Sequence, residues 1–120
     1  MNTKFEDDIK NLKLILKYCE QVSGTIEKLE IDENKFYSSY IFKNAVAMPI
    51  LQIGEFCGKL SKELLNKYPN IPWRKIIGLR NRVAHGYDGI DFEIVWLSAT
   101  ENVPELKKHC ESVLLELIKK

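Results

Sequence analysis

Apolar residues recur at alternating spacings of three and four in three separate segments of this 120-residue chain. Such spacing places the apolar side chains on one face of an α-helix, where they can pack against other helices. The three sets are Phe5, Ile9, Leu12, Leu16 and Cys19; Ile50, Ile53, Cys57, Leu60 and Leu64; and Val103, Leu106, Cys110, Val113 and Leu117. Amphipathic helices should therefore dominate, and an all-α fold is predicted.

Helix boundaries in the first half follow from a few residues. The first helix is expected over residues 4–22, because Ser23 and Gly24 should break it or its pattern, with a short continuation over 25–29 left open. Asp32 suits the N-cap of the next helix. Pro49 removes a backbone donor, so a kink or break is expected there before helix resumes to Leu64.

The second half begins with a turn over residues 68–72, followed by a helix over 73–84. Residues 90–100 are ambiguous: their β-branched and aromatic side chains allow a strand, whereas Asp91 as an N-cap allows a short helix. A lone strand would lack a partner, so helix is favoured. A last helix should begin near Pro104. The chain is thus expected to form one domain over residues 1–120, an antiparallel bundle of four long helices plus a short fifth.

Composition narrows the class of protein. The chain is 45% hydrophobic and 29% charged, as in ordinary soluble domains. No apolar run approaches the roughly 20 residues of a membrane span, and the polar N-terminal residues do not resemble a signal peptide. The three cysteines are scattered and odd in number, which argues against a disulfide framework or a metal site. We expect a cytoplasmic protein, with no membrane association, metal or cofactor.

Charge is distributed unevenly along the chain. The net charge is only +1, but residues 66–87 contain no acid. The basic residues of this segment are Lys67, Arg74, Lys75, Arg80 and Arg82. Solvated helix faces often carry such charges, but the absence of acids favours a phosphate-binding patch. Arg74, Lys75 and Arg82 are therefore candidate RNA- or phosphate-binding residues.

The same segment contains the reactive side chains Arg80, Asn81, His85 and Tyr87. Asn81 and His85, four residues apart, would share a helix face. Arg80 would lie about 140° from His85 around a straight helix, so its long side chain would have to curl toward the same edge. Tyr87 would share the side of Arg80 if helix persisted. An ordinary charged helix end with a polar histidine is the alternative interpretation.

These side chains suit RNA cleavage without a metal. The 2′-hydroxyl of RNA is a built-in nucleophile, histidine can serve as base or acid near neutral pH, and arginine can clamp the phosphoryl oxygens as charge develops. Asn81 could orient the phosphate or the imidazole. One histidine cannot easily be both base and acid, so a water or a second copy of the chain would be needed. A two-fold dimer would supply that copy.

Residues 80–87 match the pattern R-N-x-x-x-H-x-Y and strongly resemble the HepT-like branch of the HEPN superfamily. Residues 72–79 are similar to that family's lead-in to the motif, and residues 52–55 with Leu60 and Ser61 are similar to its preceding helix. The resemblance covers nearly the whole chain in helix order and length, and it is specific over about residues 50–90.

The resemblance implies an all-α homodimer whose two motifs face a shared cleft. It implies a metal-independent endoribonuclease acting as the toxin of a type VII-like toxin–antitoxin pair. The implied partner is a minimal nucleotidyltransferase antitoxin that adenylylates Tyr87, which would place phosphate in the basic cleft. By position, Arg80 and His85 are catalytic, Asn81 supports the site, and Glu55 is a supporting polar residue from the neighbouring helix.

Two other functions remain open from the residues alone. One is a non-catalytic helical module that binds a nucleotidyltransferase partner or a nucleotide, with Arg80, Arg82 and Lys75 as a phosphate cradle. The other is a purely structural bundle in which His85 is a polar residue at a helix end.

Overall fold

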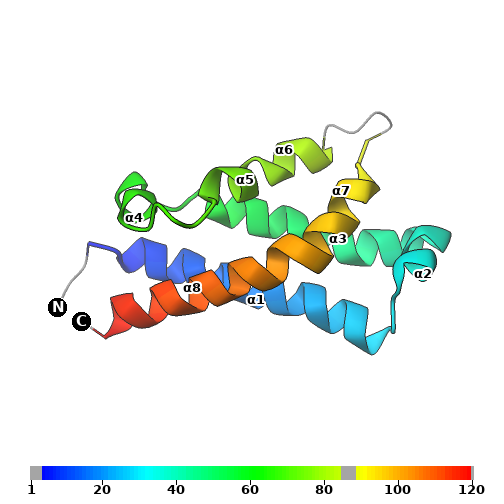
Figure 1. Cartoon of the computed structure of the whole chain (residues 1–120), viewed down its shortest axis with the longest axis horizontal. Coiled ribbons are helices and arrows are strands. Elements are labelled where there is room, and N and C mark those ends of the chain that lie inside the picture. Colours follow the sequence, from blue (N-terminus) through cyan, green and yellow to red (C-terminus); the bar gives the residue numbers. More distant parts are fainter. Residues whose placement is uncertain (1–3, 85–88, 120) are drawn as a thin grey trace.

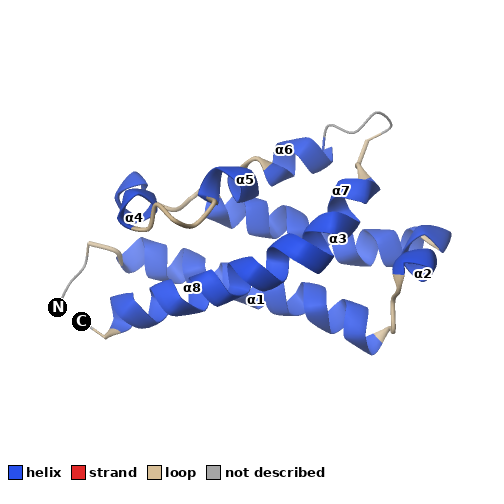
Figure 2. Ribbon diagram, viewed as in Figure 1, coloured by secondary structure: helices blue, strands red, loops and turns tan. Residues whose placement is uncertain are grey.

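The computed structural model describes residues 4–84 and 89–119, and every regular element within these ranges is helical. The elements are α1 (Glu6–Lys28), α2 (Glu33–Ser38), α3 (Tyr40–Cys57), α4 (Lys62–Lys67), α5 (Trp73–Ile77), α6 (Leu79–Ala84), α7 (Phe92–Leu97), the π-helical turn η1 (Ser98–Asn102) and α8 (Val103–Ile118). The predicted all-α class is confirmed (Figure 2).

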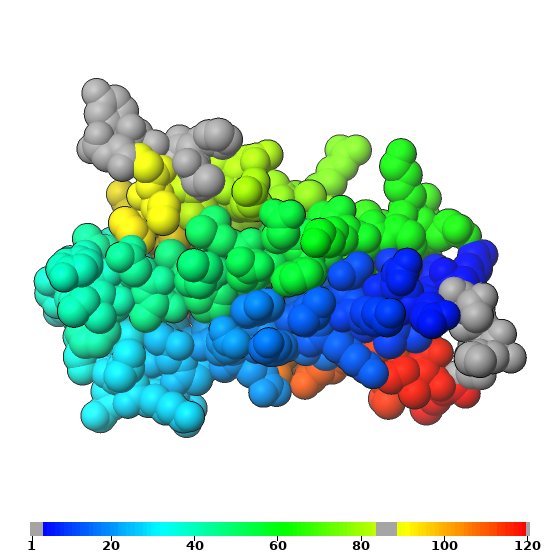
Figure 3. All heavy atoms as spheres, turned by 180° about the vertical axis from the view of Figure 1, so that it is seen from behind, coloured from blue at the N-terminus to red at the C-terminus, as the bar shows by residue number. Residues whose placement is uncertain are grey.

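Four helical segments run antiparallel along the long axis of a body measuring 50 × 29 × 20 Å (Figure 1). They are α1, α3, the pair α5–α6, and the continuous run α7–η1–α8, as the predicted bundle requires. Helix α3 contacts α1 on one side and α5–α6 on the other. Seen from behind, α3 lies across the middle of the surface, with α1 below it and α5–α6 along its upper edge (Figure 3).

Side-chain caps start the helices where the sequence predicts. Asp32 accepts a 2.7 Å hydrogen bond from the backbone N–H of Lys35 at the start of α2. Asp91 accepts bonds of 3.1 and 3.3 Å from the backbone N–H groups of Glu93 and Ile94 at the start of α7. Each cap satisfies donors that a helix N-terminus leaves unpaired. Helix is therefore confirmed over residues 92–97, and η1 joins it to α8 without a loop.

Two breaks that the sequence predicts are absent. Helix α1 continues through Ser23 and Gly24 to Lys28, and the Ser23 hydroxyl donates back to the carbonyl of Cys19 at 3.4 Å. Helix α3 also passes through Pro49 without a break. Val22 and Pro49 are buried, so tertiary contacts along both helices outweigh the local cost of a glycine or a proline. The expected helix over 73–84 is instead divided at Gly78 into α5 and α6.

The core lies where α1, α3 and α8 meet. Its fully buried members include Leu12, Ile15 and Val22 of α1, Ile50, Ile53 and Cys57 of α3, and Cys110 of α8. All three cysteines are free and buried, as predicted. Burial raises the pKa of the Cys19 and Cys110 thiols to about 12. Burial also raises the pKa of Cys57, and the neighbouring thiols of Cys110 and Cys19 add to that rise.

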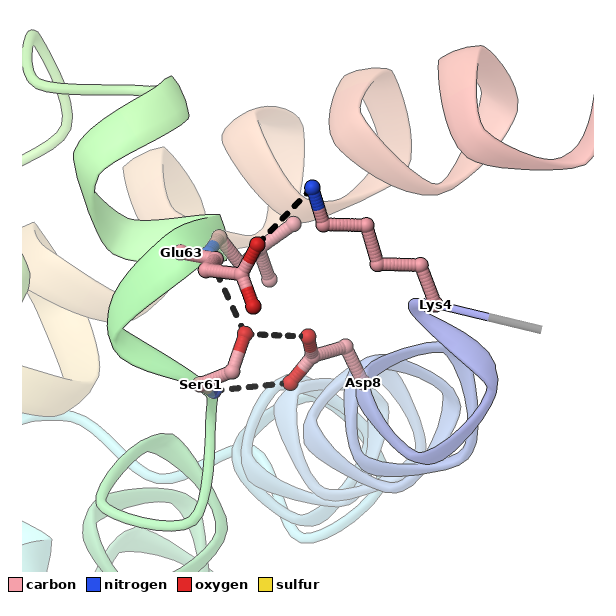
Figure 4. A network of polar contacts seen from close by, with 5 residues as sticks. Lys4, Asp8, Ser61 and Glu63 are labelled. Carbon is pink, nitrogen blue, oxygen red and sulfur yellow. Dashed lines mark hydrogen bonds and ion pairs between the residues drawn. The ribbon is translucent and has the colours of Figure 1, made fainter. Parts of the chain in front are cut away.

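A buried carboxylate ties the start of α1 to the start of α4 (Figure 4). Asp8 is 3% exposed and accepts hydrogen bonds from the backbone N–H of Ser61 at 2.8 Å and from its hydroxyl at 2.6 Å. Ser61 in turn caps α4 by accepting from the backbone N–H of Leu64 at 3.1 Å. Nearby, Lys4 Nζ lies 2.8 Å from Glu63 Oε2. Because the bonds satisfy both carboxylate oxygens, a charge can be buried here at acceptable cost.

None of the helices in the described ranges combines the length and the apolar character needed to cross a membrane.

Candidate active site

Helix α6 carries three of the predicted site residues, Arg80, Asn81 and Arg82, and it lies along α3. Its buried anchors are Leu79 and Val83, which are 2% and 0% exposed. Because these two residues face the core, Arg80, Asn81 and Arg82 are left exposed on the remaining surface of the helix. The short apolar anchor residues therefore set the orientation of the polar ones.

Arg80 and Glu55, which the sequence analysis selected from separate segments, form an ion pair. Arg80 Nε lies 3.0 Å from Glu55 Oε1, and the two side chains are 55% and 45% exposed. At this exposure, water screens the attraction, so the pair contributes little to stability. Its main effect is to hold the guanidinium in one place over α3, facing solvent.

Gly54 allows this approach of α6 to α3. A Cβ atom at Gly54 would lie 3.2 Å from Arg80 Cβ and 3.3 Å from the Arg80 backbone nitrogen. The absence of a side chain at Gly54 therefore permits the close packing of α6 against α3. At Gly58 a Cβ would meet only the carbonyl oxygens of Glu55 and Gly54, in its own segment, at 3.4 and 3.5 Å.

A hollow of about 420 Å³ lies beside the ion pair. Its lining residues are Met48, Leu51, Gln52, Glu55 and Arg80. Met48, Leu51 and Gln52 were not among the site residues predicted from the sequence. The signal was present, because residues 48, 51, 52 and 55 fall on one face of a helix. The hollow offers a fixed guanidinium at one edge and an apolar wall at the other.

The other predicted cationic residues are spread along α5 and α6. Arg74, Lys75 and Arg82 are exposed, and none of them lines the hollow at Arg80. Lys75 instead borders a small hollow of about 50 Å³ that includes His109 of α8. The structure therefore brings Arg80 together with Glu55, and it places Lys75 beside α8.

His85 and Tyr87 lie outside the residues that the structure describes. The chain on either side of them is held together, because the backbone N–H of Asp91 donates a 2.8 Å hydrogen bond to the carbonyl of Val83. The described residues on either side of this segment, Val83 and Asp91, therefore lie close together at the C-terminal end of α6.

No three His, Cys, Asp or Glu side chains gather in a metal-binding arrangement within residues 4–84 and 89–119.

Comparison with known proteins assigns the family. The model of the family described as "Ribonuclease HepT-like" matches residues 9–113. Two similar proteins of Methanocaldococcus jannaschii bear the names "Putative RNase MJ1216" and "Putative RNase MJ1380". The first is 32% identical over 86% of this chain and 84% of its own length, and the second is 37% identical over 70% and 77%. "Probable ribonuclease HepT" of Thermococcus cleftensis is 26% identical over 80% of this chain and 92% of its own.

No solved structure matches the chain. The family match spans the described helices from α1 to α8, with Arg80 and Glu55 inside it. The chain belongs to the HepT-like ribonuclease family.

Proposed function

We propose that this protein is a metal-independent endoribonuclease that acts as the toxin of a toxin–antitoxin pair. The observation that carries the proposal is the fixed position of Arg80, which begins the R-N-x-x-x-H-x-Y segment and is held by Glu55 at 3.0 Å. A positioned, solvent-facing guanidinium suits a phosphodiester, whose charge it would neutralise as a fifth oxygen joins the phosphorus.

The proposed reaction uses the RNA's own nucleophile. The 2′-oxygen attacks the adjacent phosphorus while His85 accepts the hydroxyl proton as general base. The bond from phosphorus to the 5′-oxygen breaks, and that oxygen takes a proton from a general acid. The products are a 2′,3′-cyclic phosphate and a 5′-hydroxyl. Asn81 orients the phosphate or the imidazole, and Arg74, Lys75 and Arg82 attract the RNA backbone over a wider surface.

The acid in this scheme comes from a second subunit. One imidazole that has just accepted a proton at the 2′-oxygen is poorly placed to protonate the oxygen on the opposite side of phosphorus. A homodimer with two motifs at one cleft supplies two histidines, so one acts as base and the other as acid.

The proposed control of the toxin is covalent. A minimal nucleotidyltransferase antitoxin transfers AMP from ATP to the Tyr87 hydroxyl and releases pyrophosphate. The phosphodiester formed on Tyr87 adds negative charge next to residues 66–86, which carry basic side chains and no acid. The charge and the volume of the added AMP then exclude RNA from the cleft.

The test is cleavage of defined RNA by purified protein in the presence of EDTA. Wild type is compared with His85→Ala, Arg80→Ala and the control Lys13→Ala, which removes an exposed cation from α1. We expect loss of cleavage in the first two variants only. Equal activity in all four proteins removes Arg80 and His85 from the site, and a need for added metal removes the mechanism. Tight binding of nucleotide or of a nucleotidyltransferase without cleavage would favour the binding-module alternative.

A further inference from the structure

A pair of aromatic side chains joins α1 to α3 at the surface of the protein. The two helices lie side by side (Figure 3). The rings of Tyr18 and Phe56 are stacked, with their centroids 5.9 Å apart and their planes inclined by 9°. Both side chains are partly exposed and pack on the outside of the core. These two rings, called the aromatic platform below, therefore present flat apolar surface to water.

An ammonium group lies over each ring of the aromatic platform. Lys17 Nζ is 5.4 Å from the centroid of the Tyr18 ring, and Lys59 Nζ is 4.9 Å from that of Phe56. Among the described residues, this is the one aromatic pair in which a lysine lies over both rings. Rings on which bases can stack and cations that can bind the backbone are the two features of a single-stranded nucleic-acid site.

Both lysines can leave the rings for an anion. They are exposed, and the ion pairs within residues 4–84 and 89–119 involve neither Lys17 nor Lys59. A nucleobase stacks on an aromatic ring more strongly than an exposed ammonium group does. A base can therefore take the place of an ammonium over a ring, and the displaced ammonium can bind a phosphate of the same strand.

The aromatic platform lies close to the hollow at Arg80. Gln52 lines that hollow, and Phe56 follows Gln52 by four residues in α3. The two side chains therefore share a face of the helix and are about 6 Å apart along its axis. Arg80 itself packs against α3 at Gly54, between these two positions in the sequence. An RNA strand with one phosphate at Arg80 can thus place a neighbouring base on the platform.

We infer that the aromatic platform stacks an unpaired base of the RNA beside the phosphate that Arg80 holds. Lys17 and Lys59 bind backbone phosphates next to that base. The inference rests on the proposed function and deepens it, because it names residues that position the strand at Arg80. Bases inside a duplex already stack on one another, so this subsite requires single-stranded nucleotides. It accepts any base, because every base has a face that can stack.

The first test is the affinity for a short fluorescein-labelled single-stranded RNA, measured by fluorescence anisotropy. Its 2′-hydroxyls are methylated, so it lacks the nucleophile and cannot be cleaved. Phe56→Leu keeps an apolar side chain but removes the ring, and the matched control is Phe42→Leu. Phe42 is also a partly buried ring of α3 with a lysine over it, Lys35 at 5.3 Å, but no stacked ring joins it among the described residues.

We expect Phe56→Leu to weaken binding about tenfold and Phe42→Leu to bind as wild type does. Equal affinity of the two variants, or no binding by wild type, overturns the inference. A change in the sedimentation of free Phe56→Leu with unchanged RNA affinity overturns it too, because the platform would then be a contact with another protein chain.

The salt dependence of binding tests the lysines without altering the core. Lys17→Gln and Lys59→Gln should each reduce the slope of log Kd against log salt by about 0.7, the value for one phosphate contact on a single strand. Lys28→Gln, which removes another exposed lysine of α1, should leave the slope unchanged. Slopes equal to that of wild type in both platform variants overturn the inference.

Cleavage with EDTA separates this inference from the proposed function. Phe56→Leu should raise KM about tenfold and leave kcat nearly unchanged, because the stacked base contributes to binding before and during the reaction. If wild type cleaves RNA and Phe56→Leu has the same KM, the subsite fails and the proposed function stands. If Phe56 and the lysines control RNA binding but wild type never cleaves, the subsite stands and the proposed function fails.

Discussion

Arg80 Nε lies 3.0 Å from Glu55 Oε1, which joins the start of α6 to the last turns of α3 through a half-exposed ion pair. The two side chains come from helices whose backbones approach closely at Gly54. Because both side chains are half-exposed to solvent, the ion pair adds little to the stability of the fold, and its main effect is to position the Arg80 guanidinium. It fixes the first residue of the R-N-x-x-x-H-x-Y segment beside the hollow lined by Met48, Leu51 and Gln52.

Glu55→Gln should separate the effect of the ion pair on stability from its effect on the position of Arg80. The amide keeps the shape of the side chain but loses the charge that holds the guanidinium. We expect the free energy of unfolding to change by less than about 1 kcal/mol. RNA cleavage should fall about tenfold, mainly in kcat, because a displaced Arg80 no longer matches the transition state. Urea unfolding and single-turnover cleavage measure the two quantities, and wild-type kcat would show that Glu55 does not position Arg80.

Gly54→Ala and Gly24→Ala form a matched pair of helix-interior substitutions. At Gly54 the new Cβ would lie 3.2 Å from Arg80 Cβ, so α6 must shift; at Gly24 nothing lies within 4 Å. We expect Gly54→Ala to be destabilised by about 1–2 kcal/mol, after the gain in helix propensity. Gly24→Ala should be stabilised by about 0.5–1 kcal/mol. Denaturant unfolding of both variants tests the close approach, and equal stabilisation would contradict it.

Asp8→Ala should destabilise the protein through Ser61. The substitution leaves the Ser61 backbone N–H and hydroxyl without the acceptor that now lies 2.8 and 2.6 Å away. Each buried donor left unpaired costs about 1–3 kcal/mol. The adjacent Asp7→Ala is the control, because Asp7 is exposed. We expect a clear loss of thermal stability in the first variant and little change in the second; equal melting temperatures would count against a structural role for the buried carboxylate.

The three buried thiols predict loss of stability at alkaline pH. Burial raises the pKa of Cys19 and Cys110 from 9.0 to about 12. As pH rises above 9, the thiols of the unfolded chain lose their protons first, so the free energy of the unfolded state falls relative to that of the folded state, whose thiols stay protonated. The stability due to each thiol is therefore complete below pH 9 and declines as pH rises toward 12.

Urea unfolding between pH 7 and 10.5 measures this decline in the free energy of unfolding. In Cys110→Ala the free energy of unfolding should fall less steeply with pH. Ellman's reagent at pH 8 should label the native thiols far more slowly than the urea-unfolded ones. Rapid labelling of the native protein would show that the thiols are accessible.

Much of the architecture could be predicted from the chain's local pattern. The alternating spacings of Phe5 to Cys19 and of Val103 to Leu117 specify helices with one buried face, and Asp32 and Asp91 cap the helices that follow them. The candidate site residues Arg80, Asn81, His85 and Tyr87 could also be identified from the sequence, because their order and spacing are properties of the sequence itself. These features depend on neighbours within a turn or two, where periodicity and capping act.

The breaks predicted at Gly24 and Pro49 are absent because packing between distant residues outweighs the local effect of a glycine or a proline. A glycine or proline costs the helix a fixed local amount, but burial along α1 and α3 supplies more than that amount from residues distant in sequence. The hydrogen bonds between Asp8 and Ser61 could not be predicted from the sequence either, although Asp8 lies on the same face of α1 as Leu12, Ile15 and Cys19.

The sequence by itself determined the helical class, the capping residues and the set of side chains available for chemistry, because each follows from spacing along the chain. Only the tertiary structure decided that Glu55 meets Arg80, that Gly54 admits α6 at that point, and that Met48, Leu51 and Gln52 of α3 line the hollow beside them. The physical reason is that these relations depend on which helices pack together and at what rotation. Long-range burial sets both, and no local spacing encodes them.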